Sequence, residues 1–257
     1  MYLIDCPNGV AGQLVKAGFR LNRLSQVFVT HDHSDHVLDA GSLAVLAWGS
    51  DLDHPIRFHG PPPLKQIVSR SVAASDFDTA ARMREEGRPP LKPLVQVHET
   101  RNGGVVYEDA RVKVTSAFVD HYTVRPAFAY RFDTSTRSVV ISGDTTYSDR
   151  LVNPAKGADL LIHEAMYLPG VDQLAAGNDR LKDHLLRSHS HRAGRSDRGA
   201  RRCEEARVIA SRPGISGHNG RNVAARRSRE FQGRSNRRPR SERGLTVLSI
   251  YSGWSDR

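Results

Sequence analysis

The sequence reads QVFVTHDHSDH from Gln26 to His36. Its first half, up to Thr30, is mostly apolar and predicts a buried β-strand. Its second half places three histidines and two aspartates directly after that strand. Imidazole nitrogens and carboxylate oxygens are ligands that Zn²⁺ prefers, and catalytic zinc sites keep one position open for water. The segment therefore predicts a zinc site at the end of a strand.

Other expected strands also lead to polar side chains. Three of them are each followed by a residue of the type that metal sites use: 112–118 by His121, 138–142 by Asp144 and 160–163 by Glu164. Helical spacing alternates with further short strands, with helices expected at 10–17, 41–48, 64–71 and 76–86 and strands at 2–4, 56–59, 105–107 and 127–132. This alternation predicts a layered α/β protein. The Asn102-Gly103-Gly104 segment predicts a hairpin turn.

The motif His-x-His-x-Asp-His after an apolar strand resembles the metallo-β-lactamase superfamily. His121 and Asp144 fall where that family has further ligands. His163-Glu164-Ala165 and Ser188-His189 resemble the ribonuclease Z and arylsulfatase-like branch. The resemblance covers most of residues 1–189. It implies an α/β fold, the four-layer αββα metallo-β-lactamase sandwich.

The resemblance also implies two zinc ions and assigns a role to each site residue. His31, His33 and His121 would hold the first ion, Asp35 and His36 would reach the second, and Asp144 would bridge them. Metal-activated hydroxide would attack the substrate. Asp35 would orient the hydroxide, and His189, supported by Glu164, would protonate the leaving group. The alternative for His189 is an ordinary surface histidine, and four histidines outside any motif are expected to be surface or packing residues: His54, His59, His98 and His184.

The charge of the chain is concentrated at one end. The net charge of the 257 residues is +10. Residues 1–189 contain 21 Lys and Arg against 22 Asp and Glu, a net charge of −1, whereas residues 190–257 contain 17 Arg, no Lys and 6 acidic residues, a net charge of +11. Because the part with the ligand motif is nearly neutral, its charge does not predict nucleic-acid binding. The expected partner is a small-molecule ester, with no specific nucleic acid and no membrane. Oligomeric state is left open.

The character of the sequence changes after His189. Residues 190–243 are rich in Arg, Ser, Gly and Ala and show little apolar periodicity, which predicts a disordered tail. The chain thus divides into a hydrolase domain at 1–189 and an Arg-rich tail at 190–257. The chain also opens in what resembles an internal strand of the family, so the first strands are expected to be missing. No signal peptide is visible, and the localisation of the parent protein stays open.

The tail also suggests a displaced reading frame. Re-reading the codons from the second base of His189, with synonymous codons chosen freely, permits TATEQVGRIAARAGVKKLVLSHLVPE. That sequence has an amphipathic helix, a glycine turn, a buried strand and a Ser-His pair. In the ribonuclease Z and arylsulfatase-like branch, the last ligand of the second metal is a histidine that follows such a strand. In the displaced reading, the codon of this histidine spans parts of the codons of Ala210 and Ser211. We therefore expect a net one-base frame displacement near His189.

Three functional hypotheses follow. The first is a zinc-dependent hydrolase of an ester, most readily a phosphodiester or sulfate ester, that is impaired but active with one or two zinc ions. The second is a catalytically dead, frame-damaged product that binds at most one zinc. The third is a nucleic-acid-binding protein that acts through its basic tail. Metal content separates the first two. A salt-dependent affinity that disappears on deletion of residues 190–257 would identify the third.

Overall fold

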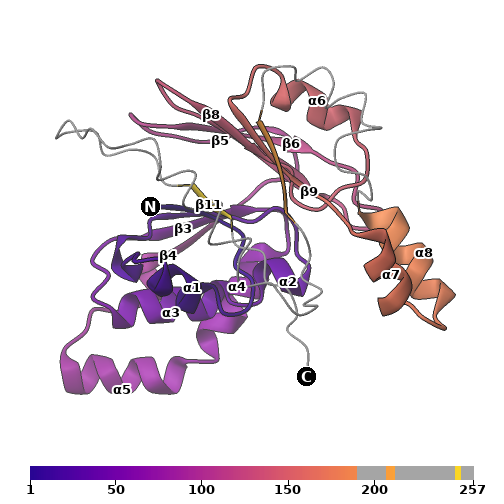
Figure 1. The fold of residues 1–257 in the computed structure, drawn as a ribbon. Coiled ribbons are helices and arrows are strands. Elements are labelled where there is room, and N and C mark those ends of the chain that lie inside the picture. Colours follow the sequence, from indigo (N-terminus) through magenta and orange to yellow (C-terminus); the bar gives the residue numbers. More distant parts are fainter. Residues whose placement is uncertain (190–206, 212–246, 250–257) are drawn as a thin grey trace.

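A computed structural model of the chain describes residues 1–189, 207–211 and 247–249. Its strands form one five-stranded and one six-stranded sheet, which lie one above the other in Figure 1. The five-stranded sheet is parallel throughout and has the order β11 (Val247–Ser249), β1 (Tyr2–Ile4), β2 (Gln26–Phe28), β3 (Ile56–Gly60) and β4 (Val95–Glu99).

The six-stranded sheet is mixed. β8 to β10 are parallel to one another, and β5 to β8 are antiparallel. Its order is β10 (Arg207–Ser211), β9 (Leu160–Glu164), β8 (Ser138–Ile141), β7 (Phe128–Asp133), β6 (Lys113–Phe118) and β5 (Gly104–Glu108). β10 and β11 lie within the segment predicted to be a disordered tail, and the rest of that segment lies outside the described residues.

Helices cover the outer face of each sheet. The five-stranded sheet carries α1 (Val10–Lys16), α2 (Ser34–Val37), α3 (Ala40–Gly49), α4 (Leu64–Ala73) and α5 (Asp76–Glu86) on its side of the molecule. The six-stranded sheet carries α6 (Asp149–Ala155), and α7 (Leu168–Leu174) and α8 (Asp179–Ser188) follow β9 at its end. Two short 3₁₀ helices occupy Leu21–Arg23 and Lys92–Leu94. None of the described helices is long and apolar enough to cross a bilayer.

Alternation along the strands divides the core into layers. In β1 and β2, Leu3 and Val27 pack against the helices, whereas Ile4 and Phe28 pack against the other sheet. This is the period of two that a strand imposes on its side chains. Phe28 meets Phe132 of β7 edge to face, with ring centroids 5.2 Å apart. A third apolar cluster lies between the six-stranded sheet and α6. The four-layer αββα sandwich predicted from the motif is confirmed.

One turn differs from its prediction. Asn102-Gly103-Gly104 joins β4 to β5, and these strands belong to different sheets. The segment is therefore a crossover between the layers and not a hairpin. The hairpin prediction is wrong because the sheet that receives the next strand depends on packing between residues that are far apart in the sequence.

Candidate metal centre

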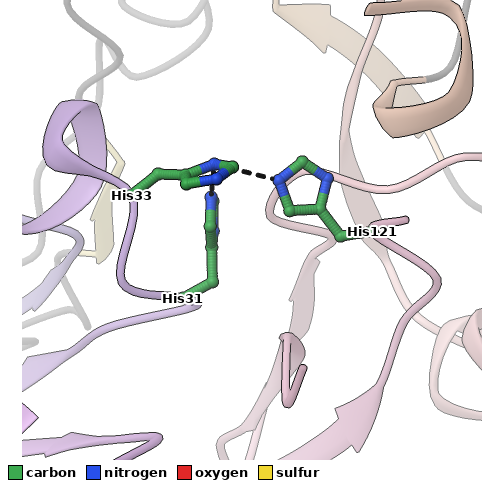
Figure 2. Close-up of side chains that lie close together, drawn as sticks. All are labelled: His31, His33 and His121. Atoms are coloured by element: carbon green, nitrogen blue, oxygen red, sulfur yellow. Dashed lines mark hydrogen bonds between the residues drawn. The ribbon is translucent and has the colours of Figure 1, made fainter. Parts of the chain in front are cut away.

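Three histidine side chains from both sheets converge at one edge of the sandwich. His31 and His33 follow β2, and His121 follows β6. Figure 2 shows the three rings pointing toward one another. Nδ1 of His33 lies 3.1 Å from Nε2 of His31 and 3.1 Å from Nε2 of His121. One nitrogen of each ring therefore faces a common point.

A second cluster shares His31 with the first. It adds His36, which lies in α2, and Asp144, which follows β8. Nε2 of His36 lies 3.3 Å from Oδ1 of Asp144. All three side chains are buried. The chain thus gathers two imidazoles and one carboxylate next to the first three rings.

A third cluster shares Asp144 with the second. It consists of Asp144, Glu164 at the end of β9, and His189 just after α8. Nδ1 of His189 lies 2.9 Å from Oε2 of Glu164 and 3.4 Å from Oδ2 of Asp144. The backbone N–H of Thr145 donates to the other oxygen of Glu164. Glu164 is therefore held from two sides, and it fixes the ring of His189.

A buried carboxylate that the sequence analysis did not single out supports this centre. Asp5 lies at the end of β1 with a φ of 60° and is 1% exposed. Its carboxylate accepts from the backbone N–H of Thr30 at 2.7 Å and from the Thr30 hydroxyl at 3.0 Å. It also lies 2.8 Å from Nδ1 of His36. Asp5 therefore ties the first strand to the loop that carries the histidines.

These contacts determine which ring nitrogen faces the cluster. Because the Thr30 hydroxyl donates to Asp5, its oxygen is an acceptor for Nδ1–H of His31, 3.0 Å away. Nδ1–H of His36 donates to Asp5 in the same way. In each ring Nε2 is then the nitrogen turned to the cluster. Outer partners of this kind orient histidines in metal sites and set their tautomers.

A backbone carbonyl does the same for the third ring. Nδ1–H of His121 donates to the carbonyl oxygen of Ser188, at the end of α8, over 2.7 Å. Its Nε2 then faces His33. The contact joins residues 67 positions apart in the sequence. A pattern of side chains in the sequence cannot predict such a contact, because the acceptor is a main-chain oxygen.

Burial keeps the first three rings in the form that binds metal. It lowers the pKa of His31 and of His33, and it lowers the pKa of His121 to about 4. Neutral imidazole is the ligand form, so these rings need not lose a proton at neutral pH to bind an ion. His36 differs. Burial opposes its charged form, but the carboxylates of Asp5 and Asp144 outweigh burial and raise the pKa of His36.

The carboxylates of the centre are also perturbed. Burial favours protonated Asp144, but the neighbouring imidazoles of His36 and His31 outweigh it and hold the pKa of Asp144 well below its usual range. Burial, with the charge of Asp144, raises the pKa of Glu164 to about 7. Burial lowers the pKa of His189, but the hydrogen bond and charge of Glu164 outweigh it and raise that pKa. The pKa values of both partners in the Glu164–His189 hydrogen bond are therefore raised above their usual values.

The donor set fits a metal ion. Two nitrogens that each lie about 2.0–2.1 Å from a tetrahedral zinc ion are separated by about 3.3 Å. Nδ1 of His33 lies 3.1 Å from Nε2 of His31 and 3.1 Å from Nε2 of His121, close to that spacing. All ligand atoms within each cluster lie within 4.8 Å of one another. Imidazole and carboxylate donors at this spacing suit zinc and related divalent ions.

The structure brings together all but one of the predicted site residues. Asp35 lies outside the three clusters; its side chain is 49% exposed, and Oδ2 is 3.8 Å from Nε2 of His36. The histidines expected to have no role also lie outside them: His54, His59, His98 and His184. Asp5, Thr30 and the Ser188 carbonyl were missed. The only signal for Asp5 in the sequence is a polar residue at a strand end.

Comparison with known proteins places the chain in a family. Residues 1–190 match the family model described as Beta-lactamase superfamily domain. The chain is 34% identical over 167 residues to Ribonuclease Z of Mycobacterium sp. (strain KMS), covering 64% of this chain and 58% of that protein. It is 30% identical over 185 residues to Ribonuclease Z of Mycobacterium bovis (strain BCG / Pasteur 1173P2), covering 71% and 65%. The chain thus spans about three fifths of the length of these curated relatives.

Solved structures share the fold. Human tRNase Z, short form, superposes with a TM-score of 0.59 at 23% identity, over 82% of this chain and 80% of that one. Zn²⁺-bound PqqB from Methylobacterium extorquens superposes with a TM-score of 0.52 at 14% identity, over 98% and 80%. At these identities the likeness concerns the fold alone.

The comparisons correct one prediction. A small-molecule ester substrate and no nucleic acid were expected, but the relatives are ribonucleases and one structural neighbour is a tRNase. The expectation was wrong because it rested on the net charge of residues 1–189, and net charge does not describe how charge is distributed around a site. The fold, the converging ligand clusters and the match over residues 1–190 lead to one conclusion: this chain belongs to the metallo-β-lactamase-fold hydrolase family.

Proposed function

We propose that this chain is a zinc-dependent phosphodiesterase that acts on RNA. The observation that carries the proposal is the row of three ligand clusters linked by His31 and Asp144. A row of this kind can hold two ions on either side of a shared carboxylate. When bound, two zinc ions supply Lewis acidity and lower the pKa of a water molecule toward neutrality.

Residues of the clusters would act as the metal ligands. His31, His33 and His121 would hold one ion, and His36 with Asp144 would hold the other. Asp35 would act from the rim of the second site. Exposed as it is, it can turn toward an ion or toward water.

The pair of Glu164 and His189 is suited to proton transfer. Oε2 of Glu164 accepts from Nδ1–H of His189, so Nε2 is the atom that would deliver a proton to the leaving oxygen. A raised pKa keeps the imidazole of His189 protonated to higher pH, which suits a general acid. Removal of the Glu164 carboxylate would leave the ring unoriented.

RNA is the substrate class that the relatives favour. They are named Ribonuclease Z, and the structural neighbours include tRNase Z. A phosphodiester also suits a row of cations, because negative charge develops on its oxygens as a nucleophile attacks. A sulfate ester has the same charge character, but the relatives named above are ribonucleases, which favours the phosphodiester.

The test compares metal content and cleavage in the same preparations. We expect zinc-loaded chain to cut a labelled transfer-RNA transcript with single-stranded extensions at both ends, and to hydrolyse bis(4-nitrophenyl) phosphate. His31→Ala and Asp144→Ala should each lose bound zinc and both activities, whereas His54→Ala, which lies outside the clusters, should keep them. Full turnover by Asp144→Ala would overturn the assignment.

We further propose that the hydrolase sequence is read in frame only to about His189, so that the domain assigned to 1–189 is incomplete, and that the displaced frame impairs this chain. The support is the register of β10, in which Ala210 lies opposite His163 and Ser211 opposite Glu164 of β9. The histidine of the displaced frame falls at the codons of Ala210 and Ser211. It would therefore stand at the strand end beside Glu164, on the same edge as the clusters.

Two measurements test the displaced frame. Sequencing the coding DNA should show an open shifted frame, and stop codons in that frame would refute the idea. A repaired chain should bind more zinc per molecule than this one. Replacing its restored histidine by alanine should return the zinc content to the present level. Equal zinc content in the repaired and unrepaired chains would contradict the proposal.

A further inference from the structure

A hollow of about 370 Å³ lies on the six-stranded sheet, where β6 ends and the connection to β7 returns. Its walls include three arginines, Arg101, Arg125 and Arg150, and its apolar part includes Phe118, Val119 and Ala127. We refer to these six residues as the arginine groove. Ligand sites have volumes of about 300–1,000 Å³, so the hollow has room for a nucleotide unit rather than for a single ion.

The three arginines come from connections that also build the metal centre. Arg125 lies four residues after His121 in the β6–β7 connection, which turns back through a bridge between His121 and Val124. Arg150 is in the first turn of α6, and its Nη1 lies 3.8 Å from Oδ1 of Asp120, the residue before His121. The groove therefore continues the loop that carries a ligand of the first cluster.

Arg101 approaches from the other sheet. It lies in the β4–β5 crossover, where Gly104 pairs with Ser116 at the start of β5. Gly103 packs so closely on β6 that a Cβ at this position would lie 3.1 Å from the carbonyl oxygen of Ser116. The crossover thus holds Arg101 beside the end of β6, where the strand reaches Phe118.

The guanidinium groups of the groove are poorly compensated by acids. Within the described residues, Arg101 and Arg125 make no ion pair, and Arg150 has only the 3.8 Å contact with Asp120. Several arginines elsewhere are paired more closely, as in the 2.8 Å contacts of Arg131 with Asp133 and of Arg187 with Asp183. Since residues 1–189 have a net charge of −1, the groove is a local concentration of positive charge.

The apolar part of the groove is held in place by packing and by a backbone hydrogen bond. The ring of Phe118 stacks on that of Phe128, with centroids 5.2 Å apart and an angle of 28° between the planes. Val119 is buried and joined to Ala127 through its backbone N–H at 3.0 Å. A cationic rim over an aromatic and aliphatic floor matches a nucleotide, which offers a phosphate at one end and a flat apolar face at the other.

We propose that the arginine groove binds the RNA strand adjacent to the phosphodiester that is cleaved. This rests on the proposed function and adds a substrate-positioning surface to it. The guanidinium groups contact successive phosphates, and a base or ribose lies against Phe118. Such contacts place the strand in register with the metal centre and are independent of its sequence.

The test is RNA binding as a function of salt. The full chain carrying Asp144→Ala, so that RNA is not cut, is titrated into a fluorescently labelled single-stranded RNA at several KCl concentrations. Replacing Arg101, Arg125 and Arg150 by Gln should weaken binding at low salt at least tenfold. It should also reduce the slope of log affinity against log salt by about 2, since each phosphate contact on a single strand contributes about 0.7.

Matched variants separate the groove from general charge. Replacing Arg20, Arg84 and Arg137 by Gln removes the same charge from other surfaces. Arg20 and Arg137 precede β2 and β8, so they lie at the edge of the sheets opposite the metal centre, and Arg84 lies on α5. This control should leave affinity and slope nearly unchanged. Lysine at the three groove positions should keep most of the slope. The basic tail is common to all variants.

Equal losses in the groove and control variants would overturn the proposal, as would a groove variant with unchanged slope. Thermal unfolding of each variant checks that the fold is retained, and the lysine variant remains informative if glutamine disturbs it. The measurements distinguish failure of this proposal from failure of the proposed function. If the chain with Asp144 intact hydrolyses no phosphodiester, the proposed function fails, while the salt slopes still decide whether the groove binds RNA.

Discussion

The ligand rings depend on residues that do not face the cluster. Asp5 and Thr30 set the direction of His31 and His36, and the Ser188 carbonyl sets that of His121. The sequence revealed the ligands because three histidines at short spacing after a strand are rare outside metal sites. It did not reveal Asp5, because a single aspartate at a strand end is common and its partners lie 25 and 31 residues away.

The role of Asp5 can be measured through metal affinity. Asp5→Asn keeps the shape of the side chain but removes the charge that orients Nδ1–H of His36, so zinc affinity should fall by about 10–100-fold. Competition with a coloured chelator measures it. Asp39→Asn is the matched control, since Asp39 accepts from the backbone N–H of Gly9 at 2.6 Å. Equal affinity in the Asp5 variant and the parent chain would contradict the role.

His59 gives a pH-dependent prediction away from the metal centre. Burial, with the charges of His98 and Arg57, lowers the pKa of His59 from 6.5 to about 4. As pH falls through this window, the unfolded chain gains a proton that the folded chain does not. Folded His59 therefore favours the fold above the window, and this contribution is lost as pH falls toward 4.

His59→Gln removes this titration while retaining a donor for Oε1 of Gln26, which lies 2.9 Å from Nε2 of His59. Between pH 6.5 and 4, the fall in the free energy of unfolding should be smaller in the variant than in the parent chain, by up to about 3 kcal/mol. Urea unfolding at a series of pH values measures the difference. Identical pH profiles for the two proteins would refute it.

At the scale of elements, the sequence predicted the strands that are apolar and short. It placed β1, β2 and β3 within two residues of their observed ends. It did not predict β4 or the helices after Asp144. β4 is half exposed and carries His98 and Glu99 at its end, so its alternation is weak. α6 has seven residues and contains Pro154, which removes the periodic signal.

The packing of α3 on α4 shows a different limit of sequence patterns. Gly41 is an unremarkable helical glycine by sequence, yet a Cβ at this position would lie 2.3 Å from Oγ of Ser71 and 2.9 Å from the backbone nitrogen of Val72. Close approach of two helices therefore requires a glycine here. The sequence alone does not say which glycine of a helix faces a neighbour.

This contact is tested within one helix. Gly41→Ala should destabilise the protein by about 1–3 kcal/mol, because α4 has to move. Gly49→Ala is the control. It lies at the end of the same helix with no atom within 4 Å of a Cβ, and it should be neutral or stabilising by up to about 1 kcal/mol. Thermal unfolding compares the two. A stable Gly41 variant would show that the helices separate easily.

At the scale of the molecule, the metal centre joins the two sheets. His31, His33 and His36 follow β2 of one sheet, whereas His121 and Asp144 follow β6 and β8 of the other. An ion held by both sets would resist their separation. Binding to the folded chain alone stabilises it by mass action.

Metal removal should therefore lower the melting temperature. At free zinc about a hundredfold above the dissociation constant, one site contributes about 2.7 kcal/mol, or about 5–10 °C for a domain of this size. Calorimetry with and without a chelator measures the shift. His31→Ala should melt at the same temperature in both conditions. A chelator-dependent shift of the same size in that variant would place the stabilising ion elsewhere.

The bond between His121 and the Ser188 carbonyl has a consequence for how this centre can be altered. Alanine at position 188 keeps the bond, since every residue type presents the same carbonyl oxygen. On the acceptor side, only a change in the phase of α8 can remove it. An α-helix turns by about 100° per residue, so adding or deleting one residue within 179–188 would rotate the carbonyl away from the ring. Changes in the length of this helix should therefore affect the centre more than changes in its composition.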